Sequence, residues 1–228
     1  MDGDVKRRSY DTARRQARSA ETRQRILAAA QDLILVNGYR ATKVAAIAAR
    51  AGVNVDTVYQ LVGRKPLILR ELIEQAISGT DHPVTARERD YVKAMKEEPD
   101  PAQKLTLYAK AVCEIQGRTA PLFLALRDAS STEPEAHRVW QEISERRAKN
   151  MRHLVRDLRD CGGLRAGLSV EQAADVVWVM NSSEMYVLFT VERGWSPHRY
   201  ERWLGDAWRR LLLNERSNPA GSPRNHLL

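Results

Sequence analysis

The stretch that decides the fold is residues 42–59, which read TKVAAIAARAGVNVDTVY. A small residue, Ala48, lies four positions before Gly52, and an apolar residue, Val58, lies six positions after it. This spacing is typical of a helix-turn-helix, in which the small residue lets two short helices cross, the glycine forms the turn and the apolar residue fills their shared core. Thr42 and Asn54 are suited to cap the two helices. An ordinary pair of antiparallel helices is the alternative.

The charge of the chain is concentrated around this stretch. Residues 1–70 contain 14 Lys/Arg and 6 Asp/Glu, whereas residues 71–228 contain 23 of each. The whole formal excess of +8 therefore lies in the first third of the chain. Such an asymmetry indicates a polyanion-binding module joined to a neutral body, although a solubilising basic surface would give the same count.

Helical periodicity and its stop signals continue on both sides of the motif. Apolar residues at helical spacing precede Gly38, and Pro or capping residues open the later segments. No run alternates as a strand would, so the sequence predicts an all-α fold of about nine helices. Besides the two short helices, we expect helices near 22–37, 64–78, 101–116, 119–130, 132–161, 169–192 and 196–213, with a connector at 80–100 that has room for one loose helix.

These segments suggest four parts of the chain. We expect a flexible basic arm at 1–20, because it has almost no large apolar side chain to offset the entropy of ordering. A DNA-binding domain follows at 21–66, then an effector-binding and dimerisation domain at 67–213. A disordered tail rich in Asn, Pro, Gly and Ser is expected at 214–228.

Several classes of protein are not indicated. No stretch is apolar enough for a membrane span, and no signal peptide is evident, so we expect a cytoplasmic protein. Cys113 and Cys161 are the two cysteines and suggest neither a disulfide framework nor a metal site. Phosphate-binding, nucleophile-elbow and zinc-protease motifs are absent, so neither an enzyme nor a cofactor is expected.

Four runs of residues resemble the signature of the TetR family of transcriptional regulators. They are Arg25–Ala30 (RILAAA), Asn37–Thr42 (NGYRAT), Ile47–Val53 (IAARAGV) and Thr57–Tyr59 (TVY). The resemblance covers about residues 22–69, and the predicted helices agree with the family over most of the remainder. The stretch from Arg193 to Trp203 is also similar to the end of many actinobacterial members.

The resemblance implies a set of DNA contacts. Thr42 matches a family position that touches a phosphate, and Lys43 beside it suits a phosphate or a guanine. Asn54, Val55 and Thr57 open the recognition helix, where Val55 could pack against a thymine methyl. The remaining candidates match phosphate clamps or nearby positions: Tyr59, Gln60 and Lys65.

Four positions depart from the family pattern. Asp56 replaces a common Gly and places a carboxylate near the DNA, where it would repel phosphate or accept a hydrogen bond from a cytosine amino group. Val62 replaces a usual Phe. Arg64 and Pro66 replace the usual Ser and Glu, and Arg64 could add a phosphate contact. The bases read by this chain are therefore not predicted by the family.

The remainder of the chain suggests a dimer with a ligand site. The 169–192 segment is apolar on nearly all sides and, with 196–213, resembles the family's four-helix dimer interface; the core helix of a monomer is the alternative. The resemblance implies an unknown small-molecule effector in the bundle, with six candidate lining residues: Tyr108, Cys113, Trp140, His153, Trp178 and Asn181. The expected function is that of a repressor that binds a palindromic operator as a dimer and is released by the effector. The alternative is a sequence-indifferent DNA architectural protein.

Overall fold

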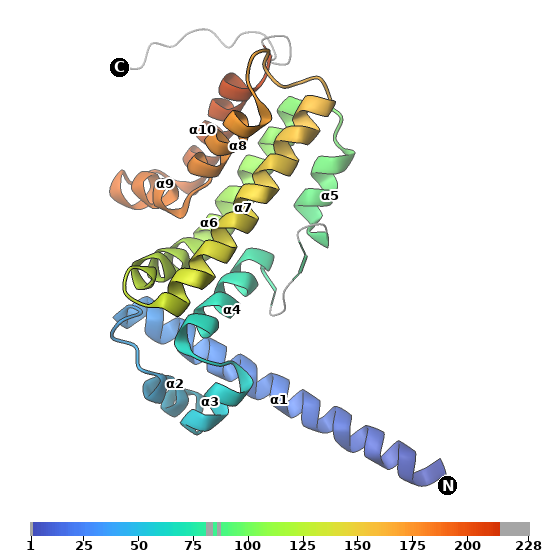
Figure 1. The fold of residues 1–228 in the computed structure, drawn as a ribbon, viewed down its shortest axis with the longest axis vertical. Coiled ribbons are helices and arrows are strands. Elements are labelled where there is room, and N and C mark those ends of the chain that lie inside the picture. The colour runs from blue at the N-terminus through green and yellow to red at the C-terminus, as the bar shows by residue number, and fades with distance from the viewer. Residues whose placement is uncertain (1, 81–83, 86–87, 215–228) are drawn as a thin grey trace. The chain divides into compact units, whose positions relative to one another are not determined.

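The computed structural model describes residues 2–80, 84–85 and 88–214, with side chains described from Arg14 onward. This part of the chain is all-helical, with ten α-helices, one π-helical turn and no strand (Figure 1). The predicted fold class is confirmed. The helices are α1 (Asp2–Asn37), α2 (Val44–Ala51), α3 (Val55–Leu61), α4 (Lys65–Ser78), α5 (Asp90–Glu97), α6 (Pro101–Ser130), α7 (Pro134–Asp160), α8 (Val170–Met180), α9 (Ser183–Val187) and α10 (Pro197–Leu212), and the π-helical turn is η2 (Leu188–Glu192).

The contacts divide the chain into two compact units. The first contains residues 1–83 and 121–142, and the second contains 84–120 and 143–228. The division falls inside α6 and α7, so it differs from the predicted boundary at residues 66 and 67, which stays a prediction. Among the described residues, no helix combines the length and the hydropathy that a membrane span needs.

In the first unit, α1 packs against α2, α3 and α4 (Figure 1). Gly52 adopts the left-handed conformation at the end of α2 (φ 67°, ψ 39°), as the predicted turn requires. Val58 is completely buried, and Ala48 is 2% exposed. The local signals of the helix-turn-helix therefore give the predicted structure.

Two predictions at the start of the chain need correction. The first helix begins at Asp2 rather than near residue 22, where the sequence predicted a flexible arm over 1–20. The arm is rich in Arg and also contains Ala, and both residues favour helix and can extend one that is already nucleated. The second helix is capped by Lys43, not by Thr42, and Lys43 makes no side-chain capping bond.

The predicted break in the middle of the chain is wrong. We expected Gly117 to end one helix and Thr119–Pro121 to begin another, but α6 is continuous from Pro101 to Ser130. Buried residues on both sides of this point, from Ala111 to Ala129, favour continuing the helix.

The predicted helix over 169–192 is also interrupted. Ser169 and Gln172 form the expected capping box at its start, but α8 ends at Met180. Ser182 then caps α9, and the chain continues into the π-helical turn. Asn181, the residue at the break, is buried among polar partners that are described below.

The second unit has an aliphatic and aromatic core. Tyr200, Leu204 and Trp208 of α10 are completely buried, and Tyr108 of α6 stacks on Trp208 with ring centroids 5.2 Å apart. α8 and α10 contact each other, which confirms that the two predicted C-terminal segments are neighbours. Asn214, the first residue of the predicted tail, bonds to the backbone of Gly162, Gly163 and Leu164, while 215–228 lie outside the described residues.

Candidate DNA interface

The outer face of α3 carries the side chains that would meet a DNA groove. Asn54, Asp56 and Gln60 are exposed, and Tyr59 is 47% exposed. Val55 and Thr57 are half-buried. Asn54 caps α3 by position but forms no side-chain capping bond, so its amide faces outward with the other candidates. One short helix therefore offers amide, carboxylate and aromatic groups on one surface.

Two cations flank this surface. Lys43 lies at the start of α2 and Arg64 at the start of α4, and both are exposed. Within the residues that the structure describes, neither forms a salt bridge. By contrast, Arg50 pairs with Asp32 at 2.8 Å and Arg23 pairs with Glu71 at 2.6 Å. Lys43 and Arg64 therefore keep their charge for an external anion.

Thr42 does not offer its hydroxyl to DNA. Its side chain is 2% exposed, and Oγ1 donates to the carbonyls of Leu33 (3.1 Å) and Gly38 (2.8 Å). These bonds fix the turn between α1 and α2. The predicted phosphate contact through this hydroxyl therefore does not fit the structure.

Lys65 is also used inside the protein. Its Nζ donates to the carbonyls of Tyr39 (2.9 Å) and Thr42 (3.2 Å) and lies 4.0 Å from the centroid of the Tyr39 ring. Burial lowers the pKa of Lys65, and the Glu133 carboxylate partly opposes that shift. These contacts hold Lys65 against the turn between α1 and α2, and the phosphate contact that the family resemblance implies for it stays a prediction.

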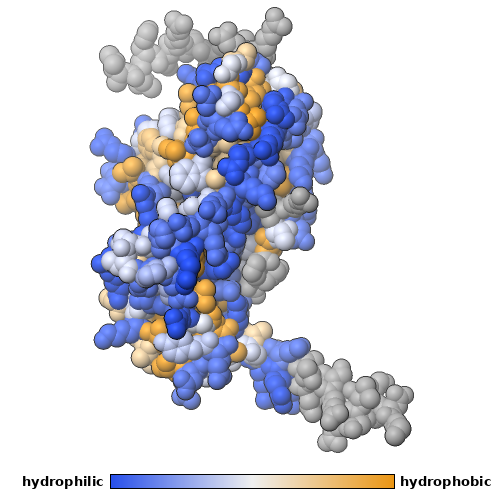
Figure 2. All heavy atoms as spheres, viewed as in Figure 1, coloured by the Kyte–Doolittle hydropathy of each residue, from blue (hydrophilic) through white to orange (hydrophobic). Residues whose placement is uncertain are grey.

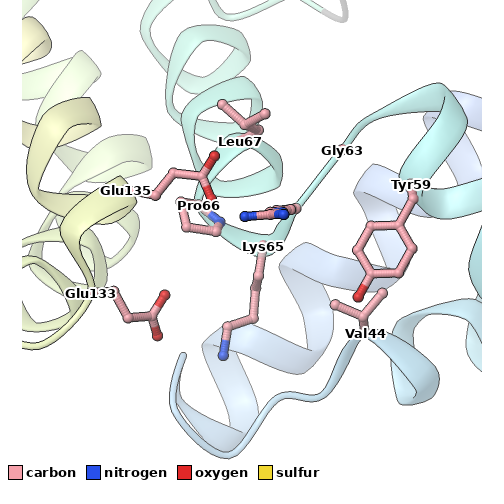
Figure 3. A pocket seen from close by; sticks show the side chains of 9 residues that line it. Val44, Tyr59, Gly63, Lys65, Pro66, Leu67, Glu133 and Glu135 are labelled. Carbon is pink, nitrogen blue, oxygen red and sulfur yellow. The ribbon is translucent and has the colours of Figure 1, made fainter.

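A cleft of about 750 Å³ opens beside these residues. Figure 3 shows Tyr59 and Val44 on one side of the cleft and two glutamates on the other. Glu133 directly precedes α7, and Glu135 lies in its first turn. The base of the cleft is the connection from α3 to α4. Its lining residues are Val44, Tyr59, Gly63, Arg64, Lys65, Pro66, Leu67, Glu133 and Glu135.

Sequence analysis missed Tyr39 and Glu133. The Tyr39 hydroxyl donates to Oε2 of Glu133 at 2.8 Å, and the Tyr39 side chain is 3% exposed. Burial, and then the bond to Glu133, raise the pKa of Tyr39 well above its ordinary value, so the phenol stays protonated. The partners are 94 positions apart, and nothing local in the sequence marks the pair.

Three of the six candidates for an effector site, Tyr108, Trp178 and Asn181, lie together in the second unit. Asn181 Nδ2 donates to the Tyr108 hydroxyl at 2.7 Å, and Trp178 lies one turn earlier on α8. Cys113 instead donates to the carbonyl of Pro197 at 3.2 Å. His153 is exposed, which does not suit the lining of an enclosed site.

Trp140, the remaining candidate, belongs to the first unit and packs beside His137, with ring centroids 6.1 Å apart. The other five belong to the second unit. The structure therefore supports Tyr108, Trp178 and Asn181 as neighbours within the second unit, and a site that includes Trp140 stays a prediction.

A half-buried arginine, Arg147, joins these neighbours and was also missed. Arg147 Nη2 donates to the carbonyls of Asn181 (2.9 Å) and Trp178 (3.3 Å), and the guanidinium lies 5.3 Å from the Trp178 ring centroid. Burial lowers its pKa. The sequence carried a signal, because Arg147 is four residues from both Ile143 and Met151 on the buried stripe of α7.

The described helices form a helix-turn-helix followed by further long helices, with an exposed polar face on α3. Residues 26–61 match the family model of bacterial regulatory proteins of the tetR family. This segment is therefore similar to the DNA-binding region of that family, and the chain has the fold of TetR-family transcriptional regulators, as predicted. The actinobacterial affinity of the C-terminal stretch stays a prediction.

Solved structures of the same fold cover nearly the whole chain. The fatty acid degradation regulator FadR from Bacillus halodurans has a TM-score of 0.67 at 17% identity, over 82% of this chain and 94% of FadR. NalD, the secondary repressor of the MexAB-OprM multidrug efflux pump in Pseudomonas aeruginosa, has a TM-score of 0.66 at 21% identity, over 86% and 98%. A putative transcriptional regulator from Saccharomonospora viridis, solved in complex with choline, has a TM-score of 0.65 at 19% identity. The alignment covers 86% of this chain and 99% of that regulator. No curated protein matches the sequence.

Proposed function

We propose that this protein is a sequence-specific transcriptional repressor of the cytoplasm that binds a palindromic operator as a homodimer and is released by a small molecule. The observation that carries the proposal is the outer face of α3. Val58 holds the helix in the core, while Asn54, Asp56 and Gln60 are exposed beside the unpaired cations Lys43 and Arg64. Nothing in this arrangement calls for catalysis.

The roles on this surface follow from chemistry. Lys43 and Arg64 contact phosphates and set the register of the head on DNA, and Tyr59 lies beside Arg64 in the same cleft. Asn54 and Gln60 read base edges, because amides can bond bidentately to adenine. Asp56 discriminates by accepting from a cytosine amino group and by repelling phosphate where no such donor is present.

Exposed apolar side chains in the second unit support dimerisation. They lie on the last helices: Val179 (50% exposed), Leu188 (58%), Val191 (68%) and Leu211 (42%). Figure 2 shows that one face of the molecule is largely hydrophilic, with hydrophobic residues gathered in a few patches. A second copy of this surface would cover the exposed apolar side chains and place two recognition helices for the two halves of a palindrome.

Introducing positive charge on this apolar surface tests the dimer. Replacing Val179 and Leu211 together with lysine should give a monomer by light scattering. The matched control is Leu35→Lys, at an equally exposed apolar position (49%) on α1. A wild-type monomer, or a double variant that stays dimeric, would remove this interface from the proposal.

The proposal for release is a population shift. An effector that binds the second domain in a conformation with wrongly spaced recognition helices weakens DNA binding reciprocally. α4 is the proposed lever, because it begins beside the recognition helix and continues for 14 residues. Other proteins of this fold were solved with small molecules, one with choline and SmeT with triclosan. A DNA affinity that no bound ligand changes would exclude this switch.

The experiment that tests sequence-specific binding is selection from a pool of random DNA duplexes by the purified full-length chain. A repressor enriches one short palindrome, with half-sites about one helical turn apart. Enrichment of no sequence, with tight binding to every duplex, would instead establish the architectural protein.

A further inference from the structure

The end of α6 and its connection to α7 contact the turn between α1 and α2 through two side-chain pairs. The Tyr39 hydroxyl donates to Glu133 at 2.8 Å, and Arg40 Nε lies 3.2 Å from Oδ2 of Asp128. The two contacts differ in burial. Tyr39 is 3% exposed, whereas the side chains of Arg40 and Asp128 are 59% and 62% exposed. The buried contact has the geometry to fix a position, while the exposed ion pair contributes little.

Lys65 ties the buried contact to both ends of the recognition motif. It is the first residue of α4, directly after the connection from α3. Its ammonium donates to the carbonyls of Tyr39 and Thr42, and Thr42 immediately precedes the cap of α2. The Lys65 ammonium therefore links the start of α4 to the backbone just before α2, and these two helices flank α3 in the sequence.

Glu133 completes this group from the start of α7. It accepts from Tyr39, and its charge acts favourably on the Lys65 ammonium, which is bonded to the carbonyl of the same tyrosine. Figure 3 shows the Glu133 carboxylate and the Lys65 side chain at the same end of the cleft. A displacement of the first turn of α7 would therefore be felt at the backbone that precedes α2 and α4.

We propose that Tyr39, Lys65 and Glu133 form a positioning triad that sets the angle of the recognition helix from the start of α7. The triad is a second route, besides α4, by which the remainder of the chain controls DNA binding, and it rests on the proposed function. Its members touch no base. They act on α3 through α2 and α4, so their loss reduces discrimination between sequences more than general attraction to DNA.

Tyr39→Phe is the variant that isolates the triad. It removes one hydroxyl from a buried bond and leaves every charge unchanged. We expect the affinity for the selected palindrome to fall about fivefold, which is within the usual range for residues that couple two sites. The affinity for a scrambled duplex should stay the same, because phosphate attraction is unchanged. The ratio of the two dissociation constants, measured by fluorescence anisotropy, is the readout.

Two further variants separate positioning from electrostatics. Glu133→Gln keeps an oxygen acceptor for Tyr39 but removes a negative charge from the cleft, so both affinities should rise and the ratio should change less than in Tyr39→Phe. In the double variant, the change in the ratio of dissociation constants should be smaller than the sum of the two single changes, because the two residues share one hydrogen bond. The matched control, Arg40→Gln with Asp128→Asn, removes the exposed pair and should keep the wild-type ratio.

The outcomes are distinct. If wild-type protein prefers a palindrome and Tyr39→Phe keeps the same ratio, the triad is overturned and the proposed function stands. If wild-type protein prefers no sequence, the proposed function and the triad both fail. A lower melting temperature of Tyr39→Phe with an unchanged ratio assigns Tyr39 to stability alone and also overturns the triad.

Discussion

Replacing Gly52 with alanine isolates the backbone energy of the turn between α2 and α3. Gly52 has φ 67° and ψ 39°, and a Cβ built there would meet only Arg25 Nη1, at 3.9 Å. Space is therefore available, and the cost comes from the left-handed conformation, about 1–2 kcal/mol for an L-residue. Alanine also lowers the entropy of the unfolded chain, which returns about 0.4–1 kcal/mol. We expect a net loss of about 1 kcal/mol in the free energy of unfolding.

Urea unfolding followed by circular dichroism measures this loss, and thermal unfolding should show a decrease of about 2–4 °C. Gly52→Asn is the control, because asparagine adopts the left-handed conformation more readily than alanine and should lose less. An alanine variant as stable as the wild type, or an asparagine variant less stable than the alanine one, would refute the conformational explanation.

Three further predictions follow from burial and charge. Burial raises the pKa of Cys113 to about 11, so this thiol stays protonated at pH 8. A disulfide reagent should therefore modify the exposed Cys161 quickly and the buried Cys113 only when the protein unfolds. Rapid modification of both thiols in the folded protein would contradict this prediction. Tyr200→Phe removes the bond from a buried hydroxyl to the Met180 carbonyl (3.1 Å) and should cost about 1 kcal/mol in urea unfolding, whereas no loss would remove that bond from the account. Deleting residues 1–18 should weaken DNA binding and flatten its dependence on salt, and an unchanged slope would exclude the arm from the interface.

The parts of the fold that the sequence predicted depend on signals between neighbouring residues. Gly52 and Gly79 both end helices in the left-handed conformation, and Ser169 forms its capping box with Gln172. Such signals act within one turn of the chain, so a single sequence contains them in full. The helix-turn-helix, the start of α8 and the end of α4 were predictable for this reason.

The failures depend on partners that are distant in sequence. The break after Met180 is stabilised by Gln116 and Arg147, which donate to the Asn181 carbonyl from α6 and α7 at 2.7 and 2.9 Å. The polar residues Asn181–Glu184 and the Ser182 cap do mark the break locally, but the long apolar runs on both sides of them favoured one continuous helix in the prediction. Likewise, Gly117 and Pro121 read as stop signals, yet the buried residues on both sides of them favour one helix.

The candidate DNA site shows the same division. The exposed residues of α3 follow from helical periodicity once Val58 is placed in the core. The roles of Thr42 and Lys65 do not, because their polar atoms are taken up by carbonyls in the turn from α1 to α2. The family resemblance identifies Thr42 and Lys65 as candidate positions, but their hydrogen-bond partners depend on how the chain packs around Tyr39.

The most direct test of the central claim, that α3 reads base sequence, is the preferred base at each operator position for wild-type protein and for Asp56→Asn. Asp56 is an exposed carboxylate in the first turn of α3, and asparagine replaces its acceptor oxygens with an amide that can also donate. The account predicts a changed preference at one pair of symmetry-related positions, away from cytosine as the base that donates to residue 56, with the remaining positions unchanged. An equal change in affinity for all sequences, with every preference retained, would contradict it.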